Sequence, residues 1–208
     1  MNYIAGIMKK TILLFHRVNT VRDKLWDPMS PELFDKTMRY LSKNYDVLPL
    51  KELCLQQVKV KRPLAISFDD GYKDFIDVAL PIMKTYQLPS SMYVVTDCVD
   101  KNLPTWTYVM DYLFYNTKKL EIGVFDYGEK CAAFAIYKWA DKEAQLQYVK
   151  KFKQFLKHVD NGQREKIMAH FLRELDDVQI PGNLMMSWDD LRSLKNENVE
   201  IGSHTFSH

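Results

Sequence analysis

The chain has 208 residues, of which 47% are apolar and 27% are charged, and these are ordinary values for a globular protein. This length allows one substantial hydrophobic core, or at most two small ones. The 29 basic and 27 acidic residues leave a net charge of only +2 and are interspersed, so no nucleic acid is expected as a partner. Three well-separated cysteines, Cys54, Cys98 and Cys131, predict no disulfide framework.

The first predicted strand covers residues 11–18, TILLFHRV. Two lysines precede its apolar run, as in a signal peptide, but the run has only five residues before His16 and no small-residue cleavage site follows. A secretory leader needs an apolar core of about 7–15 residues, and a membrane-spanning helix needs about 18. We therefore expect a strand, no signal peptide and no transmembrane segment, and by default a cytoplasmic protein.

Short apolar runs predict strands that are buried on both faces. They cover residues 11–18, 45–50, 64–68, 91–97 and 199–204. Helical patterns separate the early runs along the chain. Strands that alternate with helices indicate βα units, and hence an α/β fold with a mostly parallel sheet or barrel.

Two helices are predicted between the early strands. Ser30 can cap the first helix, with Pro31 at its first position. The apolar stripe of this helix is expected to consist of Leu33, Phe34, Met38 and Leu41. The second helix covers residues 74–86, where Pro81 must kink the helix or start a new segment because proline has no amide hydrogen to donate.

The alternation of strands and helices stops in the middle of the chain. Helical patterns fill residues 106–116, 141–159 and 161–175. They predict a helical insertion, about residues 99–185, within a single domain that covers residues 1–208. A short helix then leads into the last strand, and it is opened by Ser187 and Asp190 at the spacing of a capping box.

Two adjacent carboxylates, Asp69 and Asp70, follow the strand at residues 64–68 directly. The carboxyl ends of parallel strands form the functional face of such folds, and Gly71 permits the sharp turn that follows. Because neighbouring carboxylates repel each other, at least one of them needs a cation or a hydrogen-bond donor. A divalent metal ion would meet that need.

His204 and His208 follow the last predicted strand at i, i+4 spacing. If the residues after Gly202 form a helix, both imidazoles project from one face toward a single point. One carboxylate and two histidines make three metal ligands and leave coordination positions for water or substrate, as in catalytic sites. The other carboxylate is then free to take a proton from a metal-bound water, whose pKa zinc can lower to about 7.

Several other side chains are candidates for the same site. His16 and Arg17 end the first strand, where they contribute to the site or form a packed or ion-paired pair at its rim. Asp97 is expected to act in a helix cap or turn, and Trp188 to pack a helix against the barrel. Core packing is favoured over sugar stacking for the aromatic residues Trp106, Tyr108, Tyr112 and Tyr115.

Three stretches together resemble the polysaccharide deacetylase family, the NodB-homology domain of carbohydrate esterase family 4. They are residues 11–18 (with ILLFHRV), 46–98 (with LAISFDDGYKDF) and 186–208 (with SWDDLRSL and EIGSHTFSH). The resemblance implies a distorted (β/α)7 barrel. It implies that Asp69 is the catalytic base and that Asp70, His204 and His208 hold a divalent metal, most often Zn²⁺. The implied reaction is hydrolytic removal of N-acetyl (or O-acetyl) groups from an amino-sugar polysaccharide or oligosaccharide.

The sequence departs from the family pattern at its end. It stops at His208, whereas family members continue to an arginine that orients the base, a tryptophan-containing wall and a histidine that acts as general acid. The resemblance therefore implies an incomplete barrel, a domain that is incomplete at its C-terminus, and little deacetylase activity from these residues alone. The alternative is a degenerate homologue that binds carbohydrate or a partner without catalysis.

Overall fold

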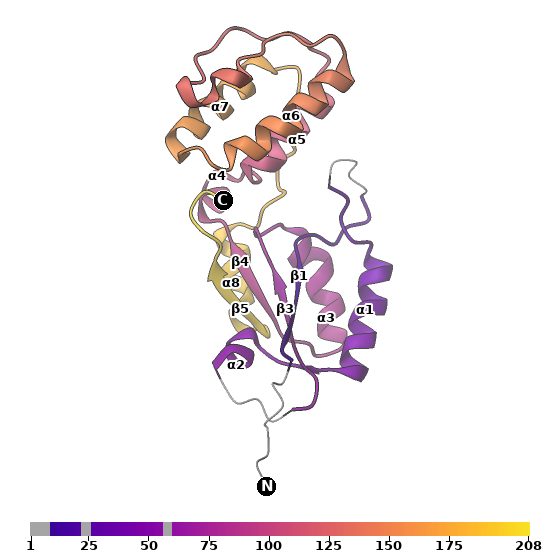
Figure 1. Ribbon diagram of the computed structural model, residues 1–208. Helices are drawn as coiled ribbons and strands as arrows, with labels where there is room; N and C mark the ends of the chain where they lie inside the picture. The colour runs from indigo at the N-terminus through magenta and orange to yellow at the C-terminus, as the bar shows by residue number, and fades with distance from the viewer. Residues whose placement is uncertain (1–8, 22–25, 56–59) are drawn as a thin grey trace. The chain divides into compact units, whose positions relative to one another are not determined.

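The computed structural model describes residues 9–21, 26–55 and 60–208 (Figure 1). The chain divides into two compact units. One comprises residues 1–102 and 183–206 with His208, and the other comprises residues 103–182 with Ser207. The assignment of the whole chain to one domain with an inserted helical segment stays a prediction. In the described part of the chain, no helix is both long and apolar enough to cross a membrane.

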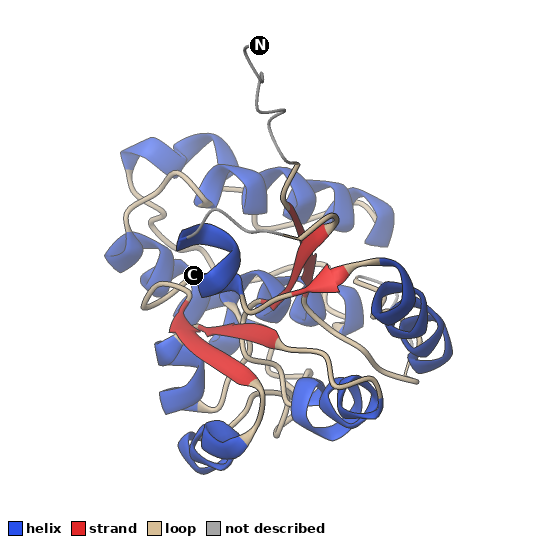
Figure 2. Ribbon diagram, turned by 90° about the horizontal axis from the view of Figure 1, so that it is seen from below, coloured by secondary structure: helices blue, strands red, loops and turns tan. Residues whose placement is uncertain are grey.

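A parallel sheet forms the centre of the first unit (Figures 1 and 2). Its strands are β1 (Thr11–Phe15), β2 (Asp46–Val47), β3 (Pro63–Phe68), β4 (Ser90–Val94) and β5 (Val199–Ser203). The strand order is β1-β3-β4-β5, and β2 pairs with the start of β3. Every pairing is parallel. The predicted α/β class with a parallel sheet is confirmed, and it agrees with an incomplete (β/α) barrel.

The prediction that the strands are buried on both faces is right for β3 and wrong for β1 and β5; none of the five residues of β5 is buried. All six residues of β3 are buried. On β1, Leu13 and Phe15 pack against the core, whereas Ile12 and Leu14 are each 52% exposed. Among the described strands, β1 pairs only with β3. It therefore buries one face of its pleat and leaves the alternate side chains half open to solvent.

Helix α1 (Pro31–Asn44) begins as the sequence predicts. The Ser30 hydroxyl accepts a hydrogen bond of 3.3 Å from the Leu33 amide, and proline occupies the first turn. The buried stripe consists of Phe34, Met38 and Leu41. Leu33 was predicted to join that stripe but is 54% exposed, because its position on the helix faces away from the core.

The segment predicted as one helix at 74–86 forms two elements. A π-helical turn, η1 (Phe75–Ala79), leads into α3 (Leu80–Thr85). The Leu80 amide donates to the carbonyl of Phe75, five residues earlier. Pro81 is the second residue of α3, and Ala79 and Leu80 just before it have right-handed helical backbone, so the helical stretch continues from η1 into α3 without a break. The structure therefore favours the alternative in which the helix is distorted near Pro81, by a π-helical turn, over the one in which a new segment starts there.

Shorter helices complete the first unit. They are α2 (Leu50–Leu55), α4 (Thr96–Lys101), α8 (Trp188–Ser193) and η3 (Leu194–Asn196). The predicted capping box at the start of α8 is present, since the Ser187 side chain accepts from the Asp190 amide and the Asp190 side chain accepts from the Ser187 amide. The main core lies between β3, α1 and α3, and contains Phe34, Met38, Ile66, Phe68 and Met83.

The second unit is helical. Its elements are α5 (Trp106–Asn116), η2 (Glu129–Phe134), α6 (Lys142–Leu156) and α7 (Asn161–Glu174). Aromatic rings fill its core: Phe114 and Phe171 meet edge to face with their ring centroids 4.8 Å apart. Asp141 and Asp160 cap α6 and α7, and each accepts a backbone hydrogen bond through its side chain.

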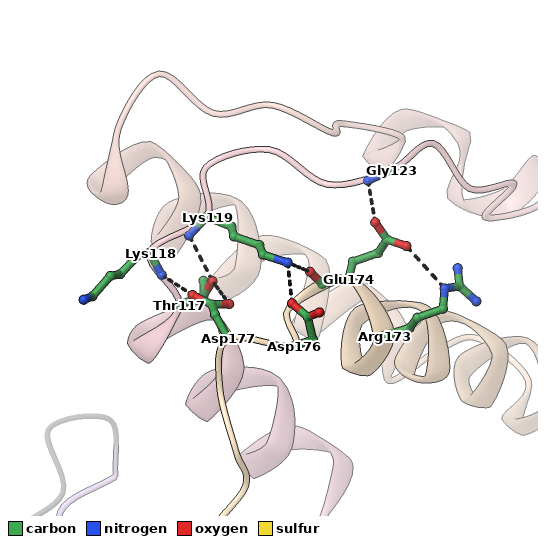
Figure 3. A network of polar contacts seen from close by, with 8 residues as sticks. All are labelled: Thr117, Lys118, Lys119, Gly123, Arg173, Glu174, Asp176 and Asp177. Carbon is green, nitrogen blue, oxygen red and sulfur yellow. Dashed lines mark hydrogen bonds and ion pairs between the residues drawn. The ribbon is translucent and has the colours of Figure 1, made fainter.

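A polar network ties the segment after α5 to the end of α7 (Figure 3). The Asp177 carboxylate accepts hydrogen bonds from the Thr117 hydroxyl at 2.7 Å and the Lys118 amide at 2.8 Å. Glu174 accepts from the Gly123 amide at 2.8 Å, and its backbone carbonyl accepts from the Lys119 ammonium at 2.7 Å. The loop after α5 is thus fixed by charged side chains from the C-terminal turn of α7.

Candidate metal centre

The turn after β3 has a backbone conformation that its sequence makes accessible. Asp70 has φ 73° and Gly71 has φ 86°, both in the left-handed region. Aspartate tolerates that region better than most residues, and glycine adopts it without steric cost. A Cβ at Gly71 would also lie 3.1 Å from Cγ1 of Val94, so this position favours glycine for space as well as for φ.

Backbone hydrogen bonds attach this turn to two neighbouring segments. The Asp69 amide donates to the Phe15 carbonyl at 3.0 Å, which extends the β1–β3 pairing by one residue. The carbonyl of Gly71 accepts from the Met186 amide at 2.9 Å, and the Lys73 amide donates to Leu184 at 2.8 Å. The two carboxylates therefore lie on a backbone segment that is anchored to β1 and to residues 184–186.

The histidine motif follows β5 without forming a helix. The His204 amide donates to the Val94 carbonyl at 2.8 Å, so the strand pairing continues to that residue. Thr205 then takes φ 63°, and its hydroxyl accepts from the His208 amide at 3.0 Å. The condition of a helix after Gly202 is not met; a turn with a left-handed residue brings the imidazoles together, with ring centroids 5.4 Å apart.

The structure brings all four residues singled out in the sequence into one cluster. Nε2 of His208 lies 3.5 Å, and Nε2 of His204 3.7 Å, from Oδ1 of Asp70. One ligand atom from each of these three residues lies within 4.8 Å of the others. Asp69 lies at the edge of the cluster, with Oδ2 4.0 Å from Nε2 of His204.

The buried Asp70 carboxylate is the feature of this cluster that most favours a cation. Asp70 is 3% exposed, and within the described part of the chain its Oδ1 accepts no hydrogen bond. Burial raises the pKa of Asp70, and the neighbouring histidines, His208 first, oppose that rise. A buried carboxylate oxygen without a donor costs free energy unless a positive charge compensates it.

The donor set and its spacing fit a divalent metal ion. Zinc binds histidine nitrogen and carboxylate oxygen at about 2.0–2.2 Å, which places two ligand atoms of one ion roughly 3–3.5 Å apart. The observed separations of 3.5 and 3.7 Å from Asp70 Oδ1 are close to this range. Three ligands leave coordination positions open, and the histidine side chains are 33% and 29% exposed, so the site is accessible from solvent.

The rim residues take structural positions beside the cluster. Arg17 forms an ion pair with Asp74, with Nε 2.8 Å from Oδ2. The His16 ring meets Trp26 edge to face at 4.9 Å between centroids. The ion pair agrees with the rim alternative for Arg17. His16 acts electrostatically on Asp70, so a contribution of His16 to the site stays a prediction.

Two other expectations have clear outcomes. Asp97 was expected to act in a helix cap or turn, but α4 has no side-chain cap among the described residues; Asp97 lies in its first turn and forms an ion pair with Lys101 at 2.7 Å. Trp188 was predicted to be a packing residue, but it is 42% exposed and its indole donates to Asp100 at 2.7 Å. Trp188 holds α4 and α8 together by a hydrogen bond at the surface rather than by burial.

Sequence reasoning missed Asp74. It is only 6% exposed and lies next to the carboxylate turn, in the same stretch, SFDDGYKDF, as Asp69 and Asp70. A third carboxylate within six residues was the available signal, because three acidic side chains at one strand end need more than one positive partner. Arg17, which lies two residues after the end of β1, is the partner of Asp74.

The fold and the cluster together define an α/β protein with a candidate metal centre at the carboxyl ends of its parallel strands. Comparison with known proteins gives its family. The sequence model described as polysaccharide deacetylase matches residues 56–208. The chain belongs to the polysaccharide deacetylase family, whose members are hydrolases that act on carbon–nitrogen bonds other than peptide bonds. No curated protein matches the chain in sequence.

Several solved structures are similar to the chain. A de-N-acetylase from Aggregatibacter actinomycetemcomitans is 18% identical with a TM-score of 0.47, and the match covers 94% of this chain and 54% of that one. The Streptococcus pyogenes deacetylase PplD, in complex with acetate, is 15% identical with a TM-score of 0.41 over 95% and 92% of the two chains. IcaB from Ammonifex degensii is 13% identical with a TM-score of 0.41 over 93% and 90%. The chain thus spans about half the length of the first of these proteins.

Proposed function

We propose that the chain is a metal-dependent hydrolase that removes N-acetyl (or O-acetyl) groups from an acetylated amino-sugar polysaccharide or oligosaccharide. The observation that carries the proposal is the convergence of Asp70, His204 and His208 at the end of the sheet, with Asp69 beside them. Membership of the polysaccharide deacetylase family supports the reaction class and the kind of substrate.

Asp70, His204 and His208 would hold the metal ion, most often Zn²⁺ in such a donor set. When bound, a divalent ion supplies Lewis-acid chemistry, since it lowers the pKa of a water molecule and polarises a carbonyl. The protein fixes the three ligands through the φ values of Asp70 and Thr205 and through the strand pairing that ends at His204. Such preorganisation avoids reorganisation during the reaction.

Asp69 would act as the general base. Its side chain is 15% exposed, compared with 4% for Asp70, so it can reach a water molecule at the mouth of the site. The carboxylate takes a proton from water as the water oxygen forms a bond to the acetyl carbon. The carbon–nitrogen bond then breaks, and the sugar nitrogen takes up the proton held by Asp69 to become a free amine. Acetic acid leaves and ionises to acetate.

The test is acetate release from an N-acetylated chitooligosaccharide with Zn²⁺ present. The measured quantity is the difference in rate between wild type and Asp69→Asn. This difference reports catalysis by Asp69 even if the total rate is small. We expect Asp69→Asn to lower the rate by about 10²–10⁴-fold while leaving Zn²⁺ affinity within a few-fold of wild type.

Asp97→Asn is the matched control, because Asp97 is a carboxylate near the end of β4 that lies outside the cluster. It should leave the rate unchanged. Equal rates for wild type and Asp69→Asn, with metal and sugar still bound, would contradict the proposal and favour a carbohydrate-binding homologue without catalysis.

A further inference from the structure

Arg17 and Asp74 form a nearly buried ion pair, and Asp74 lies four residues after Asp70 in the sequence. Nε of Arg17 lies 2.8 Å from Oδ2 of Asp74, and the two side chains are only 9% and 5% exposed. The Asn19 amide group lies 3.5 Å from the same oxygen. Among the ion pairs of the described residues, no other has both side chains below one tenth exposed.

The ion pair is one of two contacts that attach the ends of the segment bearing Asp69 and Asp70 to the end of β1. The turn begins where the Asp69 amide donates to Phe15 at the end of β1, at 3.0 Å. It ends at Asp74, which Arg17 holds from a position two residues after Phe15. Both ends of the segment 69–74 are therefore attached to residues 15–17, at the end of β1.

The guanidinium also contacts the middle of the turn. Its central carbon lies 4.8 Å from the centroid of the Tyr72 ring, a cation–π distance. Tyr72 is fully buried and packs with Val95, Cys98 and Met185. Arg17 thus fixes Tyr72 by its face and Asp74 by its charge, and these residues lie two and four positions after Asp70.

Stability alone is a weak reason for such a pair. Desolvation of two charges offsets much of their attraction, and apolar replacements of buried ion pairs are often neutral or stabilising. A buried ion pair with fixed directions is better suited to holding one geometry than to adding free energy. The segment next to this pair is the left-handed turn at Asp70 and Gly71.

We infer that Arg17 is a positioning residue for the candidate metal centre: through Asp74 and Tyr72 it sets the orientation of the Asp69 and Asp70 carboxylates. The inference rests on the proposed function, because only that function gives the orientation of the two carboxylates a role in metal binding and catalysis. Arg17 is not one of the clustered ligand residues, so we expect it to act on their geometry rather than on the chemistry itself.

The experiment compares wild type with Arg17→Gln, which removes the charge and keeps a side-chain donor, and with Arg17→Lys, which keeps the charge. The probe is Co²⁺, whose visible absorption reports the ligand geometry of the site. We expect Arg17→Gln to weaken Co²⁺ binding by about 10–100-fold and to change the absorption bands, as substitutions behind metal ligands do. Arg17→Lys should recover most of the affinity.

A second readout needs no metal. The Lys73 amide donates from the turn to the Leu184 carbonyl, and the amides of Val95 and Met186 donate to carbonyls of the turn. Hydrogen exchange at these three amides therefore reports the order of the turn in the metal-free protein. Arg17→Gln should speed exchange at all three amides and leave the amides of β4 protected. If wild type bound no Co²⁺ through His204, the proposed function would fail, and exchange would still decide whether Arg17 holds the turn.

Lys153→Gln is the matched control, because Lys153 forms a comparable ion pair with Asp111 in the helical unit, with side chains 19% and 22% exposed. It should lower the melting temperature without changing the Co²⁺ bands. If Arg17→Gln also lowered only the melting temperature, with unchanged Co²⁺ bands and a Co²⁺ affinity within twofold of wild type, the inference would be overturned. If Arg17→Gln does not fold, the double variant Arg17→Gln, Asp74→Asn leaves no uncompensated buried charge and is subject to the same two outcomes.

Discussion

Oδ1 of Asp70 lies 3.5 Å from Nε2 of His208, although one residue follows β3 and the other follows β5. The parallel sheet explains the meeting, because β4 separates these strands and all three end at the same edge. Each residue then leaves its strand through a left-handed conformation, at Asp70 itself and at Thr205. The cluster therefore depends on two local turns as much as on the sheet.

The substitution Gly71→Ala tests how much the first turn depends on its backbone conformation. Alanine would have to adopt φ 86° and place its Cβ 3.1 Å from Cγ1 of Val94. We expect a loss of about 1–3 kcal/mol in the free energy of unfolding, measured by urea denaturation. Gly182→Ala is the control, since no atom lies within 4 Å of the Cβ it would add, and it should change stability by less than about 0.5 kcal/mol.

Removal of metal should affect wild type and Asp70→Asn differently. A metal at 100 times its Kd stabilises the folded chain by about 2.7 kcal/mol, so a chelator should lower the melting temperature of wild type by roughly 5–10 °C. Asp70→Asn should show no such shift. Its metal-free form should melt at or above the metal-free wild type, because the substitution removes a buried charge whose Oδ1 accepts no hydrogen bond among the described residues. An equal effect of chelator on both proteins would exclude Asp70 as a ligand.

The buried His170 predicts how stability depends on pH. His170 is 1% exposed, and its ring stacks on Phe125 with centroids 4.6 Å apart. Burial lowers the pKa of His170; Glu174, 3.9 Å away, opposes the shift, and the Arg173 guanidinium at 3.0 Å adds to it. The fold therefore favours neutral imidazole, so the stabilisation is present above the ordinary pKa of about 6.5 and is lost as pH falls below it.

The measurement is the difference in urea midpoint between pH 7.5 and pH 5.5 for wild type, His170→Gln and His158→Gln. His170→Gln should have the smaller difference, because glutamine does not titrate in this range. His158 is exposed, so His158→Gln should behave as wild type does. A pH dependence that is the same in all three proteins would show that protonation of His170 does not destabilise the fold.

Much of the fold could be predicted because its signals are local. Apolar runs located the strands, and parallel strands gather their carboxyl ends at one edge, which was enough to expect Asp70 and the two histidines together. Ser30 and Ser187 marked helix starts through capping chemistry that depends on residues within a few positions.

The failures concern contacts that the local sequence does not determine. The turn at Thr205 replaces the expected helix because the chain bonds back to β4 through His204 and to α4 through Phe206. The half-exposed face of β1 reflects which neighbours the strand has, not its own apolar residues. The Arg17–Asp74 pair joins two segments that are distant in sequence, so neither residue alone indicated the other.

Zn²⁺ titration of the 208-residue chain, followed by calorimetry at constant pH, tests the central claim most directly. We predict one Zn²⁺ per wild-type chain. The affinity should fall by at least about 100-fold in His204→Ala and in His208→Ala, because loss of a direct ligand should cost at least as much as loss of a residue that orients a ligand. The affinity of His158→Ala should be unchanged. Equal Zn²⁺ affinity in wild type and in both cluster variants would show that the three side chains lie together without forming a metal site, and the proposed hydrolase mechanism would then have no basis.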